Sequence, residues 1–143
     1  MRARGVLLAV LLAATVPTGC ARSDPGRSAA SLIVEYFAAA NAAAGRGPAA
    51  QQRFFEATQH PDFRDEPCPL QGITVVSEPA MATLRPDPDW LPAGARQPPR
   101  GTSHVVAVTA TVHRGQADLG TQIGSEHVVV LDGRAYGFAP CPS

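Results

Sequence analysis

The sequence predicts an α+β domain in which two N-terminal helices pack on a curved, mostly antiparallel sheet of four to five strands, cone-like and fastened by one disulfide. Three observations predict this class. Before residue 60 the apolar residues recur every three or four positions, whereas from residue 73 onward they alternate with polar ones. Near the C-terminus, Asp132-Gly133 joins two apolar runs and is the strongest hairpin signal of the chain.

The first helix is expected from about Ala29 to Ala44, because Ser28 can cap its N-terminus and Gly45 can end it. Its apolar side chains fall on one face at helical spacing, so we expect them in the core. They are Leu32, Ile33, Tyr36, Phe37 and Ala40.

A second helix is expected from Pro48 to about Gln59, because proline suits the first turn of a helix and Pro61 disfavours helix in the residue before it. Its apolar face should bury Phe54, Phe55 and Thr58. The side chains expected in water are Gln51, Gln52 and Glu56. Since the link between the helices is so short, they should form an antiparallel pair.

Two short strands are expected next, over Ile73–Val76 and Ala80–Leu84, the second either separate or a continuation of the first across Pro79. Residues 85–102 should then form a loop, because five prolines gather around Trp90. The clearest strand is His104–His113. One of its faces is apolar throughout and consists of Val106, Val108, Ala110 and Val112.

The last two strands should form a hairpin. After a turn near Arg114-Gly115, a strand is expected to run to Leu131 and to return as Arg134–Ala139. If Leu131 pairs with Arg134, the facing pairs further along are Val129 with Tyr136 and His127 with Phe138.

This order of elements, with its final hairpin, resembles the nuclear transport factor 2-like (ketosteroid isomerase-like) fold over about residues 29 to 140. The resemblance implies a concave mouth that holds a small molecule, and relatives with isomerase or hydratase activity place an aspartate base opposite a tyrosine there. No residue of this chain matches a family motif position by position, so no catalytic role is carried over. The proline-rich stretch stands where the family has a third helix.

The first 19 residues have the three parts of a secretory signal: a positive head at Met1–Arg4, an apolar run at Val6–Val16 and a small-residue site at Thr18-Gly19-Cys20. The apolar run is much shorter than the roughly 20 residues that a membrane-spanning helix needs. Gly19-Cys20 resembles the processing site of bacterial lipoproteins, which implies that Cys20 is acylated and becomes the first mature residue.

Two alternatives to that processing remain. Pro17 stands where the lipoprotein site usually has an aliphatic residue, so ordinary signal cleavage after Ala21 competes with it. An uncleaved anchor is the other, and the short apolar run disfavours it. On the lipoprotein interpretation the chain divides into a signal peptide (1–19), an acylated cysteine with a flexible tether (20–28) and one α+β domain (29–143).

The three cysteines fit the same interpretation. If Cys20 carries lipid, Cys68 and Cys141 remain as an even pair in an oxidising compartment. Each of these two lies between prolines, which favour stiff, extended backbone. We therefore predict a structural disulfide between Cys68 and Cys141.

Composition narrows the function. All twelve basic residues are arginine, as in GC-rich actinobacterial coding, and they form no basic stripe, so nucleic acid is not an expected partner. The lack of lysine excludes Schiff-base chemistry. No phosphate-binding loop, zinc-protease helix, nucleophile turn or calcium loop is present, so we expect no cofactor. The three strand histidines, which in principle suit zinc, are interpreted as surface residues: His104, His113 and His127.

The candidate pocket residues are Tyr36, His127, Tyr136 and Trp90, with Glu126 and Asp118 as further titratable groups. The simpler interpretation of the tyrosines is that they are aromatics at the edge of the core. Trp90 is expected either to cover the mouth of the sheet as a lid or to be an exposed anchor for a protein partner.

The sequence therefore favours a non-enzymatic binding module, anchored by lipid on the extracytoplasmic face of the cell membrane. Its expected ligand is a small apolar molecule or an envelope protein. The alternative is an isomerase- or hydratase-like enzyme that uses Tyr, Asp or His in the pocket.

Overall fold

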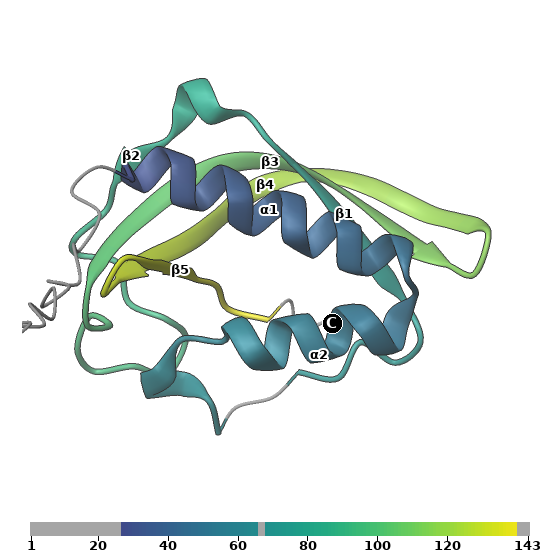
Figure 1. The fold of residues 1–143 in the computed structure, drawn as a ribbon, viewed down its shortest axis with the longest axis horizontal. Coiled ribbons are helices and arrows are strands. Elements are labelled where there is room, and N and C mark those ends of the chain that lie inside the picture. Colours follow the sequence, from purple (N-terminus) through teal and green to yellow (C-terminus); the bar gives the residue numbers. More distant parts are fainter. Residues whose placement is uncertain (1–26, 66–67, 140–143) are drawn as a thin grey trace, which may run out of the picture.

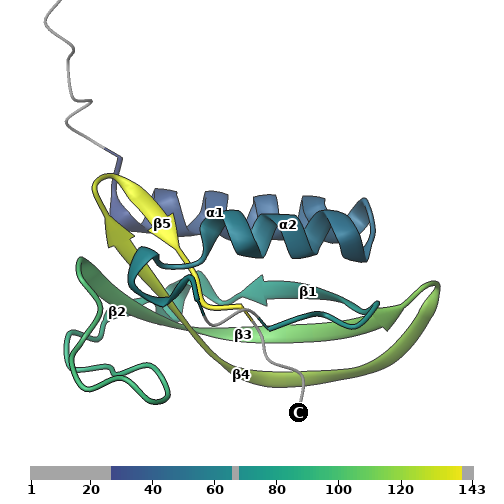
Figure 2. The ribbon, with the colours of Figure 1, turned by 90° about the horizontal axis from the view of Figure 1, so that it is seen from below.

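The computed structural model describes residues 27–65 and 68–139. Two helices, α1 (Ala29–Gly45) and α2 (Pro48–Thr58), lie on the concave side of a curled antiparallel sheet (Figures 1 and 2). The predicted α+β class, with two helices before a curved sheet of four to five strands, is confirmed. The strands are β1 (Thr74–Pro79), β2 (Arg85–Pro86), β3 (Thr102–Arg114), β4 (Ala117–Leu131) and β5 (Arg134–Tyr136).

Local signals explain both helices. Ser28 caps α1, its hydroxyl accepting a hydrogen bond from the Ser31 amide at 3.1 Å. Gly47, with φ near +101°, makes the tight link into α2, and the two helices run antiparallel (Figure 1). The predicted apolar face of α1 is buried from Leu32 to Ala40. In the part of the chain that the structure describes, no helix is both long and apolar enough to cross a bilayer.

The sheet is built around β3. One side of β3 pairs with β1 over Val108–His113 and with β2 at His104 and Val105, while its other side pairs with β4 along its whole length. The short β5 lies beyond β4, so the strand order is β1-β3-β4-β5. The predicted facing pair of Val129 with Tyr136 is confirmed.

The predicted pairing of His127 with Phe138 is wrong. Strand β5 ends before Gly137, because the chain turns there toward the end of α2. The Gly137 amide donates to the Thr58 carbonyl at 3.0 Å, and the His60 amide donates to the Gly137 carbonyl at 3.1 Å. The end of the chain is thereby joined to α2 instead of to β4.

The predicted strand Ala80–Leu84 is also wrong, because residues Met81–Thr83 form one 3₁₀ turn. The Ala80 amide donates to the Ala107 carbonyl at 2.8 Å, and the Ala107 amide donates to the Thr83 hydroxyl at 2.9 Å. The Thr83 side chain thus accepts the bond that a strand carbonyl would have accepted. The chain then returns to β3 as β2, which occupies the first two residues of the predicted proline-rich loop, and residues 87–101 contain no helix or strand.

The expectation that Gln51 faces water is wrong. Gln51 is fully buried, and its amide bonds both backbone groups of Val75, accepting from the N–H at 2.9 Å and donating to the carbonyl at 2.6 Å. Asn41 does the same for Ser77, at 3.0 and 2.8 Å. Because β1 is an edge strand, these two amides take the place of a missing neighbouring strand.

Several predictions fall on residues outside those that the structure describes. These are the signal peptide, the acylated Cys20 with its tether to residue 26, and Cys141. Cys68 lies inside the described residues, but its predicted partner does not, so the disulfide stays a prediction.

The side-chain amides of Gln51 and Asn41, which bond β1, are called the amide clamp below. Replacing Gln51 tests its role. Gln51→Met keeps the volume but leaves the N–H and C=O of Val75 without partners, which we expect to lower the free energy of unfolding by about 2–3 kcal/mol. Gln116→Met, in the exposed β3–β4 turn, is the control and should change it by less than about 0.5 kcal/mol. Urea unfolding measures both, and a Gln51→Met protein as stable as the wild type would contradict the clamp.

Candidate functional site

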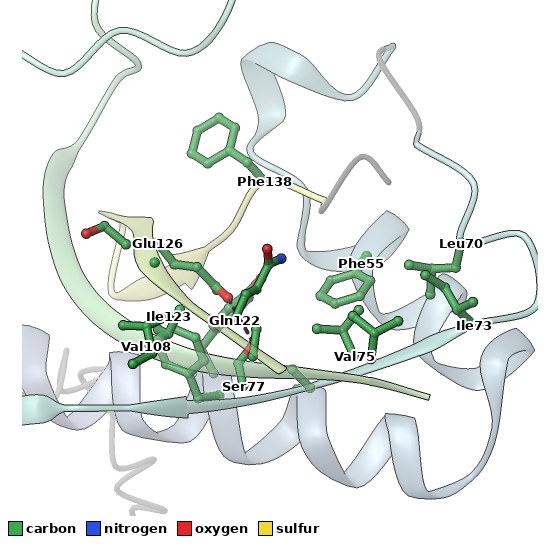
Figure 3. A pocket seen from close by; sticks show the side chains of 17 residues that line it. Phe55, Leu70, Ile73, Val75, Ser77, Val108, Gln122, Ile123, Glu126 and Phe138 are labelled. Atoms are coloured by element: carbon green, nitrogen blue, oxygen red, sulfur yellow. Dashed lines mark hydrogen bonds between the residues drawn. The ribbon is translucent and has the colours of Figure 1, made fainter. Parts of the chain in front are cut away.

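A cavity of about 520 Å³ lies between the helices and the concave face of the sheet (Figure 3). Two groups of packed apolar residues contribute to its walls. One, around Ile33 and Phe37, joins α1 to β3 and β4, and the other, around Phe55 and Ile73, joins α2 to the segment before β1. The apolar lining residues are Phe37, Ala40, Phe55, Leu70, Ile73, Val75, Val108, Ala110, Val112, Ile123 and Phe138.

The cavity exists because several lining residues are too small to fill it. Ala40 of α1, Ser77 of β1, Ala110 of β3 and Gly124 of β4 all contribute to its walls. Larger side chains at these positions would bring the helices and the sheet into direct contact. A volume of this size falls within the range of about 300–1,000 Å³ that small-molecule sites occupy.

The cavity opens along the edge of β4. Lining residues 122–125 are all exposed to solvent, and Ile123 is 83% exposed. Among the described residues no strand pairs with this side of β4, since β5 pairs only with Val129–Leu131. A ligand can therefore enter without displacing a strand of the described chain.

Among the described lining residues, Glu126 supplies the only carboxyl group (Figure 3). It lies opposite Val106 on β3, on the face of the sheet that the helices cover. Its Oε1 accepts a hydrogen bond from the Ser77 hydroxyl at 2.9 Å. Burial raises the pKa of the Glu126 carboxyl, and the bond from Ser77 opposes that shift in part.

Tyr36 also lines the cavity. The hydroxyl lies so close to Gly137 that any Cβ at that position would overlap it. Burial raises the pKa of the Tyr36 phenol, the nearby Glu126 carboxylate adds to the shift, and a hydrogen bond with Thr58 opposes it. The ring packs against Phe54, with 5.4 Å between the centroids.

The other predicted pocket residues do not line this cavity. His127 lies opposite Val105, on the face of the sheet away from the helices. Trp90 stacks on the His127 ring at 4.1 Å and 5° and meets Phe138 edge-on at 4.7 Å. Tyr136 meets the His60 ring edge-on at 5.9 Å. The structure thus separates Tyr36 from the other three.

A side-chain hydrogen bond between His127 and Asp87 attaches the proline-rich loop to this outer face. His127 Nε2 and Asp87 Oδ2 lie 2.9 Å apart, and the Asp87 amide donates to the Ser103 carbonyl at 2.9 Å. Together with the stacked rings, these contacts hold Trp90 half-buried against the sheet. Trp90 therefore covers His127 and is not an open anchor.

The far end of the same loop is held by His60, which is fully buried. Its Nε2–H donates to the Arg100 carbonyl at 2.9 Å, and its Nδ1 accepts from the Asp62 amide at 3.2 Å. The Arg100 guanidinium pairs with the Asp62 carboxylate at 2.6 Å, and this pairing lowers the pKa of Asp62. The loop is thus fastened at both ends.

The three strand histidines lie apart and have separate partners. His104 Nδ1 bonds the Thr102 carbonyl at 3.0 Å, and His113 Nδ1 lies 2.5 Å from Asp118 at the tip of the β3–β4 hairpin. His127 is paired with Asp87. Among the described residues no group of three or more metal-ligating side chains comes together.

A scan against protein-family models finds no match for this chain, and searches of the curated proteins and of the solved structures find none either.

Removing the Asp87 carboxylate, which is hydrogen-bonded to His127, should loosen the proline-rich loop. Asp87→Ala removes the partner of His127, so we expect acrylamide to quench Trp90 more strongly and the free energy of unfolding to fall by about 0.5–1 kcal/mol. Asp89→Ala is the matched control, since Asp89 is exposed two residues away. Because the chain has one tryptophan, its emission reports this loop alone. Equal quenching in both variants would contradict the attachment.

Glu126 should make stability depend on pH. The folded protein holds this proton more tightly than the unfolded chain does. Its contribution is therefore complete below the ordinary carboxyl pKa and is lost as pH rises through the raised value. We expect urea unfolding from pH 4 to 8 to show the wild type losing stability relative to Glu126→Gln. Glu78→Gln, an exposed carboxyl on β1, should follow the wild type at every pH. A Glu126→Gln curve parallel to that of the wild type would contradict the assignment.

Proposed function

We propose that this chain is an exported, lipid-anchored protein whose domain binds a small, mostly apolar ligand in the cavity beneath its helices, without catalysing a reaction. One observation carries the proposal: an apolar cavity of about 520 Å³ that opens at the edge of β4. Mostly apolar walls that carry a small number of polar side chains are typical of sites that bind small molecules. The envelope-protein alternative has less support, because Trp90, its expected anchor, is packed on His127.

Export and the lipid anchor rest on the leader, with Cys20 as the acylated residue. The proposed disulfide between Cys68 and Cys141 has geometric support. Cys68 and Ala139 line one small hollow beside α2, and Ala139 precedes Cys141 by two residues. The likeness to the nuclear transport factor 2-like fold also stays a proposal, supported by the two helices, the curled sheet and the cavity on its concave side.

Blocking the cavity should abolish ligand binding. Ala110→Phe places a ring in the lining, while Thr109→Phe places it on the opposite face of the same strand. We expect organic extracts of the full-length wild type and of Thr109→Phe, purified from native membranes, to contain a common enriched small molecule by mass spectrometry. The Ala110→Phe extract should contain less than about a tenth of it, since a filled pocket loses its apolar contacts. No enriched species, or equal amounts in all three, would refute the proposed function.

The anchor is tested by metabolic labelling with a fatty-acid probe. We expect the wild type and Cys68→Ala to take up label and Cys20→Ala to take up none, because acylation needs the Cys20 thiol. Wild-type protein without label would favour ordinary cleavage after Ala21 and would end the lipoprotein assignment.

A second candidate function is supported by Glu126 alone. A carboxyl group with a raised pKa in an apolar cavity is suited to general acid–base chemistry, as in an isomerase or hydratase. Neither Asp118 nor His127 lines the cavity, so Glu126 would have to act as the base. A Glu126→Gln protein that still binds the extracted molecule, but no longer converts it, would establish this candidate over simple binding.

A further inference from the structure

The proposed function leaves one feature of the cavity unexplained, namely its charge. Glu126 is an acid, and the described lining residues include no arginine, lysine or histidine. A carboxylate among apolar side chains costs free energy unless it is protonated or meets a cation. The protein places the acid there without supplying the cation.

The partners of Glu126 are known atom by atom. Oε1 accepts from the Ser77 hydroxyl, and none of the ion pairs among the described residues includes Glu126. Its second oxygen, Oε2, has no hydrogen bond within the described chain. Because no fully buried side-chain oxygen there lacks a partner, Oε2 is accessible rather than sealed. One oxygen is therefore held and the other is open to a ligand.

The acid is also held in place before any ligand arrives. The backbone of Ser77 is fixed by both atoms of the Asn41 amide, at 3.0 and 2.8 Å, and its hydroxyl in turn fixes Glu126. Such preorganisation favours binding because less ordering remains to be done. Two aromatic rings, those of Phe55 and Phe138, line the same cavity (Figure 3). Aromatic faces attract cations.

We infer that the ligand of this cavity is a hydrophobic organic cation, a monoamine whose ammonium group meets Glu126 Oε2 and whose apolar body fills the space between α1, α2 and β3. The inference rests on the proposed function, because it names the ligand class of the same cavity. An apolar carboxylic acid is disfavoured, since its charge would face Glu126 with no base between them.

Three probes with one apolar body and different head groups test this class: 1-adamantanamine, 1-adamantanol and 1-adamantanecarboxylate. Titration calorimetry on the full chain at pH 7 should show the amine binding about tenfold more tightly than the alcohol, because its bond to the carboxylate is charge-assisted. The carboxylate should bind most weakly. The amine affinity should also rise with pH as Glu126 loses its proton, while the alcohol affinity should not.

Glu126→Gln should remove the tenfold preference for the amine over the alcohol, and Glu78→Gln should keep that preference as the wild type does. If the alcohol binds as tightly as the amine, or if Glu126→Gln keeps the preference for the amine, the inference that the ligand is a cation is refuted. The proposal that the cavity binds an apolar ligand is not refuted by either result. If none of the three probes binds the wild type, the inference is overturned together with the proposed function. The wild-type comparison of the three probes needs no variant, so a poorly folded Glu126→Gln protein would not remove the test.

Discussion

Two side-chain amides determine how the helices sit over the sheet. Asn41 of α1 and Gln51 of α2 each bond the N–H and the C=O of one residue of β1, Ser77 and Val75 respectively. Both helices are thereby fixed to the same edge strand by hydrogen bonds, which specify a geometry more narrowly than apolar contact does. Since small residues such as Ala110 face the helices, this spacing leaves room inside. The cavity is thus a consequence of the clamp.

The opposite side of the cavity depends on where the last strand stops. Gly137 leaves β5, bonds the backbone at the end of α2 and lies directly beneath the Tyr36 hydroxyl, where no side chain fits. The Gln59 side chain continues the connection by accepting from the Ala139 amide at 2.8 Å. This departure from the sheet brings Phe138 into contact with both the cavity and Trp90. Both walls of the site therefore depend on polar contacts made by α2.

The spacing of apolar residues along the sequence predicted those helices and strands that bury one continuous apolar face. The apolar face of α1, the strand β3 and the hairpin at Asp132-Gly133 are of this kind, because local pattern and turn chemistry determine them. The errors came from polar residues whose role is set by distant partners. Gln51 is buried because it bonds β1, and Thr83 replaces a backbone acceptor of β3. No local pattern encodes such long-range bonds.

In the candidate site, too, local pattern predicted some features, whereas distant contacts determined others. Alternation along β4 places Glu126 on the same face as the buried Val128, which is a signal that the sequence contained. The aromatic residues His127, Tyr136 and Trp90 were grouped with Tyr36 because of their chemistry, yet the sheet separates them. His127 and Trp90 hold the proline-rich loop on the outer face, while the cavity opens on the inner side along β4. The loop nevertheless touches the cavity wall at one point, because Trp90 meets the ring of Phe138, a lining residue, edge-on.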